Sequence, residues 1–151
     1  MIDLGTVLPQ VGFYDEEHIF PVNYCVKRRF WSIEGEDARA DYTCKIVKVD
    51  DFIVFQITCQ NFPELLISSH TAQECVEQLL AKVNAGRQNL TLTVNKGLGF
   101  FGLSDSWIIN LIEELPGTVK CRGYRFQFVN PDKLQIAHDA PRVLGKRRTV
   151  K

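Results

Sequence analysis

The chain has 151 residues, of which 45% are hydrophobic and 24% charged, and its formal net charge is zero. Length and composition predict one ordinary soluble globular domain, long enough for a core of its own. The chain lacks the run of about 18 apolar residues that a membrane span requires, and its start lacks the basic-then-apolar pattern of a signal peptide, so we expect no membrane contact.

The first 35 residues are predicted to be irregular with short extended pieces. Within them, Lys27–Trp31 places three basic residues before two aromatic rings. Such a cluster is typical of nucleic-acid contact, but a strand with its charges outward and its rings inward has the same pattern. We favour the strand, because residues 1–141 contain 13 basic and 18 acidic residues, and this negative balance opposes duplex binding.

A β-hairpin is predicted next. Apolar side chains alternate along Tyr42–Val47 and Ile53–Cys59, and Asp50 and Asp51 lie between the two segments. Period-two alternation around turn residues indicates paired strands with one buried face.

The first helix is predicted over about 69–85. Thr71 and Glu74 have the spacing of a capping box, and Gly86 lies at the helix end. Between them, apolar residues recur every three or four positions and form one stripe: Ala72, Cys75, Val76, Leu79, Leu80 and Val83.

Three glycines at 97–102 raise the main alternative function. Gly97, Gly99 and Gly102 match G-x-G-x-x-G, the pattern of a loop that binds the pyrophosphate of a dinucleotide. The chain lacks the buried parallel strand before such a loop and the acidic residue about 20 positions after it. Phe100 and Phe101 also bring two rings to a place where bare backbone must approach phosphate. We therefore favour a packed aromatic hinge, and nucleotide binding remains the alternative.

The second helix is predicted over about 104–115. Ser104 is a suitable N-cap, Asp105 complements the helix dipole, and Pro116 and Gly117 end the helix. Its apolar stripe is expected to face the core: Trp107, Ile108, Leu111, Ile112 and Leu115. After the turn, Gly123–Val129 alternates apolar and polar residues, which predicts a strand with one buried face.

The C-terminal residues form a basic tail. Beyond Asp139 there are five basic residues and no acidic one, and residues 140–151 are predicted to be flexible. Lys146, Arg147 and Arg148 fit a nuclear-localisation patch or a phosphate contact, and equally a solubilising end. At most, weak nucleic-acid binding is expected from this tail.

No catalytic, cofactor or metal site is predicted. The cysteines are odd in number, without C-x-x-C spacing, and are expected to be small buried hydrophobes in a reducing compartment: Cys25, Cys44, Cys59, Cys75 and Cys121. The histidines lie in unlike contexts (His18, His70 and His138), and neither G-x-S-x-G nor H-E-x-x-H occurs.

Together these elements indicate an α+β fold: a single module with a mainly antiparallel β-sheet packed with two α-helices, at about 69–85 and 104–115. No repeat or low-complexity stretch precedes the tail.

Two groups of motifs, in this order, resemble the two halves of the FYR (phenylalanine/tyrosine-rich) domain. The first group resembles FYRN: Gly12–Glu16, Ile19–Tyr24, Arg28, Trp31-Ser32 and Tyr42–Ile46. The second resembles FYRC: Phe100–Ser104, Leu111–Glu113, Leu115–Gly117, Lys120-Cys121, Tyr124 and Phe126. The resemblance implies one module over 1–139, with an FYRN-like part at about 3–50 and an FYRC-like part at about 51–135.

The residues that carry the resemblance are expected to be structural: Phe13, Tyr14, Pro21, Tyr24, Trp31, Tyr42, Phe100, Phe101, Gly102, Ser104, Trp107, Leu111, Pro116, Gly117, Cys121, Tyr124 and Phe126. Two positions depart from the family pattern. Asn23 stands where the family usually has Gly, and Asn tolerates positive φ. Ser106 stands where it usually has Pro, which the first helical turn favours but does not require.

The resemblance implies a non-catalytic protein–protein interaction module of a nuclear, chromatin-associated protein. A short chain that is nearly all FYR domain indicates an accessory subunit of a histone-modifying or chromatin-remodelling complex. Its expected partners are subunits of such a complex, with histones as a second class. A weaker alternative is a direct histone-tail reader, in which the acidic body contacts basic tails.

Overall fold

The computed structural model describes residues 2–35, 38–85 and 96–133. One antiparallel sheet has its five strands in chain order. The strands are β1 (Ile2–Asp3), β2 (Cys25–Trp31), β3 (Arg39–Val49), β4 (Phe52–Cys59) and β5 (Leu66–Ser69). The helical segments are α1 (Ala72–Ala85), α2 (Gly97–Phe100), α3 (Ser106–Glu113) and a 3-10 turn, Thr118–Lys120. The predicted α+β class is confirmed.

The predicted hairpin is the centre of the sheet. β3 and β4 pair from Tyr42↔Cys59 to Val49↔Phe52, with Asp50 in the turn at φ 55°. The alternation places Cys44 and Ile46 on a fully buried face, opposite Ile57 and Phe55. β2 adds a seven-residue strand to this pair. It contains Lys27–Trp31, for which a strand was favoured, within a segment that was otherwise predicted to be irregular with short extended pieces.

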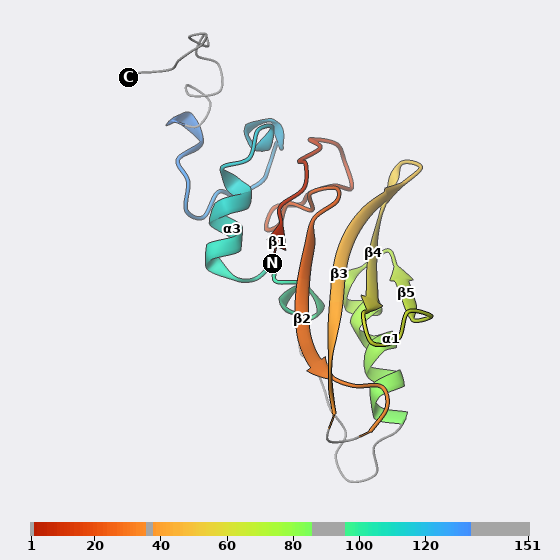
Figure 1. The fold of residues 1–151 in the computed structure, drawn as a ribbon. Helices are drawn as coiled ribbons and strands as arrows, with labels where there is room; N and C mark the ends of the chain where they lie inside the picture. Colours follow the sequence, from red (N-terminus) through yellow and green to blue (C-terminus); the bar gives the residue numbers. More distant parts are fainter. Residues whose placement is uncertain (1, 36–37, 86–95, 134–151) are drawn as a thin grey trace, which may run out of the picture.

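The helices lie on one face of the sheet. In Figure 1, α1 lies behind β3, β4 and β5, and α3 lies beside β1 and β2. The α1 stripe is buried as predicted except for Leu80, which is half-buried. Thr71 Oγ1 accepts a hydrogen bond from the Glu74 N–H at 3.1 Å, which caps the helix start. Among the described residues, no helix has the length and apolar content needed to cross a bilayer.

The second predicted helix is shorter than expected. α3 begins at Ser106, and the N-cap position belongs to Asp105 rather than to Ser104. A four-residue helix, α2, precedes it where only a hinge was predicted. The departures from the family pattern cause no disruption: Asn23 adopts φ 70°, and Ser106 starts α3.

The predicted strand over Gly123–Val129 is wrong: Gly123 belongs to a turn, 124–126 are irregular and 127–129 form bends. Phe128 is exposed, and Tyr124 and Phe126 stack edge to face at 5.1 Å instead of lying along a sheet. The predictions for Gly86, His138 and the tail at 140–151 concern residues outside the described ranges.

Candidate functional site

Arg28 of β2 and Tyr24, directly before that strand, join the two halves of the chain. The guanidinium of Arg28 donates from Nε to the Phe100 carbonyl at 2.7 Å and from Nη2 to the Gly99 carbonyl at 2.8 Å. The Tyr24 hydroxyl donates to the Phe101 carbonyl at 2.6 Å. These carbonyls lie at the end of α2, where a helix leaves acceptors without partners of its own. The strand prediction placed the charged side chains outward. For Arg28 this is wrong, because its guanidinium binds the carbonyls of the α2 segment.

The glycine-rich segment is packed rather than open. A Cβ on Gly97 would lie 2.5 Å from the backbone of Gln73 in α1, and the Gly97 N–H donates to Gln73 Oε1 at 2.7 Å. Gly102 has φ +78°, and a Cβ there would lie 3.0 Å from Ile108 Cδ1 and from the Tyr24 hydroxyl. Gly97 thus lets α2 approach α1, and Gly102 lets the segment approach α3 and the Tyr24 side chain.

The same segment lacks the row of accessible N–H groups that a phosphate loop presents. Besides Gly97, four of its N–H groups donate within the segment, with carbonyl acceptors from Lys96 to Gly99: those of Phe100, Phe101, Gly102 and Leu103. The rings of Phe100 and Phe101 are buried. This geometry favours the aromatic hinge over a nucleotide site.

A buried carboxylate binds the backbone of the segment that was predicted to be a C-terminal strand. Glu113 is 0% exposed. Its Oε2 accepts from the Tyr124 hydroxyl at 2.6 Å and the Gln127 N–H at 2.7 Å, and its Oε1 accepts from the N–H groups of Phe128 and Val129, each at 3.0 Å. Burial and this carboxylate raise the pKa of the Tyr124 hydroxyl, so it stays a donor. Sequence reasoning missed this role of Glu113. The available signal was its place directly after Ile112, at the edge of the predicted apolar stripe.

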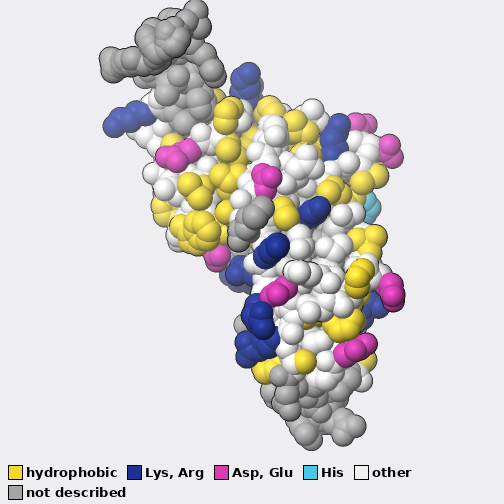
Figure 2. Space-filling view, in the orientation of Figure 1, with side chains coloured by type: hydrophobic (Ala, Val, Ile, Leu, Met, Phe, Trp, Pro, Cys, Tyr) yellow, Lys and Arg dark blue, Asp and Glu magenta, His cyan; other side chains and the backbone are white. Residues whose placement is uncertain are grey.

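The outer side of α3 is an exposed apolar surface. Trp107 is 58% exposed and Leu111 is 37% exposed, whereas Ile108 and Ile112 are buried. The prediction that Trp107 and Leu111 belong to the core is therefore wrong. Each lies one position before a buried residue, and one position turns the helix by about 100°. Figure 2 shows hydrophobic side chains gathered over α3.

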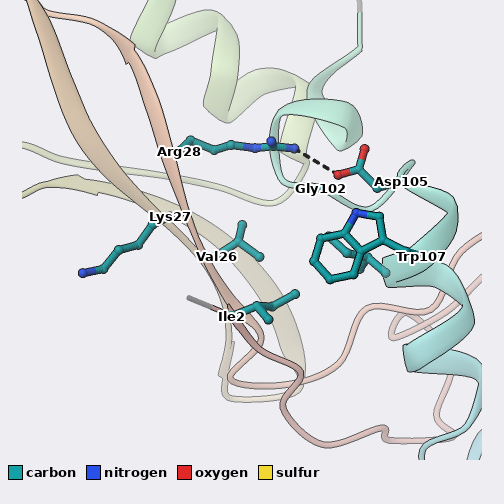
Figure 3. A pocket seen from close by; sticks show the side chains of 8 residues that line it. Ile2, Val26, Lys27, Arg28, Gly102, Asp105 and Trp107 are labelled. Carbon is teal, nitrogen blue, oxygen red and sulfur yellow. Dashed lines mark ion pairs between the residues drawn. The ribbon is translucent and has the colours of Figure 1, made fainter.

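A pocket of about 180 Å³ adjoins this surface between β1, β2 and α3. In Figure 3 the indole of Trp107 faces Ile2 and Val26, while the Arg28 guanidinium lies 3.5 Å from the Asp105 carboxylate at the other side. The pocket thus has apolar walls and one ion pair. We define the surface of Trp107 and Leu111, together with this pocket, as the α3 site.

The α3 site resembles a binding surface more than a reaction centre. It contains no Ser, Cys or His among its lining residues. In the described part of the chain, no group of three or more His, Cys, Asp or Glu side chains is placed to hold a metal ion. His18 and His70 lie elsewhere, His18 beside Asp15 at 3.9 Å and His70 with Nδ1 3.4 Å from the Ile53 carbonyl.

Four of the five free cysteines are buried, as predicted, and Cys25 is half-buried. Burial raises the pKa of Cys75 to about 12 and that of Cys121 to about 11. Their thiols are therefore protonated at neutral pH and poor nucleophiles.

Most of the remaining motif residues are at least half-buried. Those buried are Phe13, Pro21, Tyr24, Tyr42, Phe100, Phe101, Gly102, Cys121 and Tyr124. Those half-buried are Tyr14, Trp31, Gly117 and Phe126. Ser104 and Pro116 are exposed, like Trp107 and Leu111. Lys146, Arg147 and Arg148 lie outside the described residues.

The geometry defines an α+β module in which aromatic rings and the side chains of Tyr24 and Arg28 join an N-terminal half to a C-terminal half. The family model for the F/Y-rich N-terminus (FYRN) matches residues 1–49, and that for the F/Y-rich C-terminus (FYRC) matches residues 53–129. The chain therefore belongs to the FYR family, with its two halves contiguous, and the resemblance found in the motifs is confirmed.

Similar proteins of two kinds are found. Transforming growth factor beta regulator 1 of Homo sapiens is 33% identical over 143 residues, which cover 91% of this chain and 35% of that protein. Histone-lysine N-methyltransferase trr of Drosophila melanogaster is 25% identical over 138 residues, covering 84% of this chain and 6% of that protein. Histone-lysine N-methyltransferase 2D of Homo sapiens is 24% identical over 135 residues, covering 83% and 2%.

The chain thus spans about a third of the length of the first of these relatives and a small part of the methyltransferases. What it shares with them is the FYR region, which is a non-catalytic domain.

Proposed function

We propose that this chain is a non-catalytic protein-docking module of a nuclear, chromatin-associated protein, and that it serves as an accessory subunit of a histone-modifying or chromatin-remodelling complex. Support comes from relatives whose names denote histone-lysine methyltransferases and which contain the same module. Because the match covers only the FYR region of those enzymes, a role in assembly fits it better than a role in methyl transfer.

The observation that carries the proposal is the α3 site. A tryptophan that is 58% exposed on a rigid helix, four residues from a second exposed apolar side chain, is costly in water. Tryptophan is also enriched among the residues that dominate interface energies. The adjoining pocket can take one apolar side chain of a partner between Trp107 and Ile2.

The Arg28–Asp105 pair sets the chemistry of the pocket rim. Both side chains are about one-third exposed, so each retains capacity for a hydrogen bond to a partner backbone. Arg28 is held by two carbonyls of the α2 segment, and its position is therefore fixed before binding. The α3 site thus combines an apolar anchor with a preorganised polar rim, as interfaces commonly do.

The test is affinity purification of the tagged full chain from nuclear extract, in parallel with the variants Trp107→Ala and Leu111→Glu. Phe52→Ala is the matched control, because Phe52 is 64% exposed on the hairpin, away from α3. We expect the unmodified chain and the control to recover subunits of histone-modifying or remodelling complexes, and the two α3 variants to lose them. Recovery of metabolic enzymes alone, or equal recovery by all four proteins, contradicts the proposal.

A further inference from the structure

The sheet has a second face that the helices do not cover. Residues of β2 and β3 alternate between the buried face and this outer face, and the described helices pack on the buried one. On the outer face, β2 and β3 carry four exposed cations: Lys27, Arg29, Arg39 and Lys45. We call these four residues the basic face.

Few acidic side chains offset the basic face. Asp41 is the only one that β2 and β3 place there, and it lies 3.2 Å from Arg29. Asp3, on the neighbouring strand β1, accepts a hydrogen bond from the Gly5 N–H. The acidic balance of residues 1–141 therefore does not extend to this face, and Figure 2 shows Lys and Arg side chains in a line over β2 and β3.

The strand register fixes the spacing of the cations. Lys45 pairs with Cys25 and lies diagonal to Lys27, while Arg39 pairs with Trp31 and lies diagonal to Arg29. Diagonal neighbours on a sheet are about 7–8 Å apart. The centre of the Lys27/Lys45 pair and the centre of the Arg29/Arg39 pair are four residues apart, about 13 Å along the strand. A row of cations of this length suits several phosphates of an extended polymer, whereas one small anion would reach a single pair.

A stacking platform ends the row. The guanidinium carbon of Arg39 lies 4.2 Å from the centroid of the Trp31 ring. A guanidinium stacked on an aromatic ring is held flat, and its other face is open to a further planar group. Nucleic-acid bases stack on such guanidinium planes and on aromatic rings. The Tyr42 hydroxyl donates to the Trp31 carbonyl at 2.7 Å, which holds the backbone below the platform.

From this arrangement we propose that the basic face binds single-stranded nucleic acid, with phosphates against Lys27, Lys45 and Arg29 and a base against the Arg39–Trp31 platform. The ligand chemistry is that which RNA and DNA single strands share: regularly spaced phosphates and bases that stack. A duplex fits less well, because a flat face has no element that enters a groove. Lys27 also lines the pocket of the α3 site, but its side chain points away from Trp107 (Figure 3), and the proposal does not depend on that site.

An acidic protein also fits the face less well. Polar Thr43 lies between the cations, and the neighbouring strand β4 adds polar Gln56 and Thr58 beside them, so no apolar anchor stands there. Protein interfaces have an apolar centre, whereas the exposed apolar side chains of the outer face lie away from the cations, Leu66 on β5 and Val49 and Phe52 at the hairpin end.

The test measures fluorescence anisotropy of labelled oligouridylate and oligothymidylate with the full chain at low and physiological salt. All variants are compared in two backgrounds, natural and Lys146→Ala/Arg147→Ala/Arg148→Ala, so that the tail is measured separately. Lys27→Glu/Lys45→Glu should weaken binding at least about tenfold. The control Lys82→Glu/Lys120→Glu, which changes the same charge at exposed lysines elsewhere, should change it less than about twofold.

A second variant separates stacking from charge. Arg39→Lys keeps the charge but not the planar guanidinium. It should therefore weaken the binding of both oligonucleotides by about fivefold or more and leave the binding of inorganic polyphosphate unchanged. If Lys27→Glu/Lys45→Glu melts early, Lys27→Gln/Lys45→Gln replaces it.

Three results would overturn the proposal: equal effects of the sheet and control variants, loss of all binding on neutralising the tail alone, or polyglutamate binding as tightly as the oligonucleotides. Trp107→Ala should leave oligonucleotide binding unchanged, so the failure of one proposal is distinguishable from the failure of the other.

Discussion

At the scale of single residues, Glu113 determines the path of the C-terminal segment. A buried charge is costly unless hydrogen bonds replace its hydration. Here both oxygens accept two hydrogen bonds each, from one hydroxyl and three backbone N–H groups. The N–H groups that a strand would have paired with a neighbour are bound to this carboxylate, which explains why the alternating residues after Gly123 form no strand.

Glu113→Gln should destabilise the protein by about 2–4 kcal/mol, because an amide loses the charge and turns its NH₂ group toward N–H donors. The matched control is Glu114→Gln, at the exposed neighbouring position, for which we expect a change within about 0.5 kcal/mol. Urea unfolding of both variants measures the difference. Equal, small effects would show that the carboxylate is not the anchor.

Because Trp107 is exposed, replacing it by alanine should cost less stability than replacing the smaller but buried Phe101. Phe101 is fully buried, with its ring 5.3 Å from that of Phe55 in an edge-to-face contact. Phe101→Ala should therefore cost about 3–5 kcal/mol of unfolding free energy. Trp107→Ala should cost less than about 1 kcal/mol, because most of its ring already contacts water. Thermal and urea unfolding of the two variants decide this, and a similar loss for both would place Trp107 in the core.

The buried thiols predict a fall in stability at alkaline pH. In the folded chain, burial raises the pKa of Cys121 to about 11 and of Cys75 to about 12, from the ordinary 9.0. Above pH 9 the unfolded chain loses these protons first, so it binds fewer protons than the native state and stability decreases as pH rises. The stabilisation is complete below pH 9 and declines toward pH 11–12.

Urea unfolding at a series of pH values measures this decline, with Cys121→Ala as the reference. The slope should be at most about 1.4 kcal/mol per pH unit for each thiol, and smaller in Cys121→Ala by the share of that residue. An identical pH profile for both proteins would contradict the assignment.

At the scale of elements, α2 shows how one part of the chain supports another. Its four residues include two glycines, which disfavour an isolated helix. It forms because Gly97 can approach α1 closely, and because Arg28 and Tyr24 of the sheet side satisfy its terminal carbonyls. The glycines thus serve packing between elements.

Tyr24→Phe tests this cap directly. The variant keeps the ring and leaves the buried Phe101 carbonyl without its donor, which should cost about 1–3 kcal/mol. Tyr14→Phe removes the same hydroxyl from a half-buried ring and should cost less than about 0.5 kcal/mol. Comparable stability of the two variants in urea would show that the hydroxyl of Tyr24 does not stabilise α2.

At the scale of the whole molecule, the two family halves are interleaved. The boundary between them falls in the turn of the central hairpin, so β3 and β4 pair eight residues across it. Arg28 and Tyr24 of the first half bind carbonyls of the second, and the Arg125 N–H donates to the Glu16 carbonyl at 2.9 Å. Each half therefore contributes polar groups that the other satisfies.

We predict that the halves fold only together. Expressed alone, residues 1–50 and residues 51–151 should each lack a cooperative thermal transition, because each exposes the edge and the core face of a central strand. Mixing them should restore the transition and dispersed amide signals. A cooperative transition in either half by itself would disprove the single-module prediction.

How much followed from the sequence can be judged from particular elements. The hairpin, α1 with its cap, the tolerance of Asn23 for positive φ and the family were predictable, because each depends on local spacing or on motifs in order. The strand after Gly123 was not, because the acceptor that captures its N–H groups lies on α3. The α3 site was not predictable either. The spacing of apolar residues shows which ones share a side of the helix, but not which of them the rest of the fold covers.

The sequence by itself determined the class, the pairing of the central strands and the aromatic composition of the core, since these follow from residue type and period. Only the tertiary structure decided which charges are structural and which are presented to solvent. Arg28 and Arg29 are neighbours in the chain, yet one caps α2 while the other lies on the basic face. A strand turns successive side chains to opposite faces, and what each face then meets is set by the packing of the whole chain.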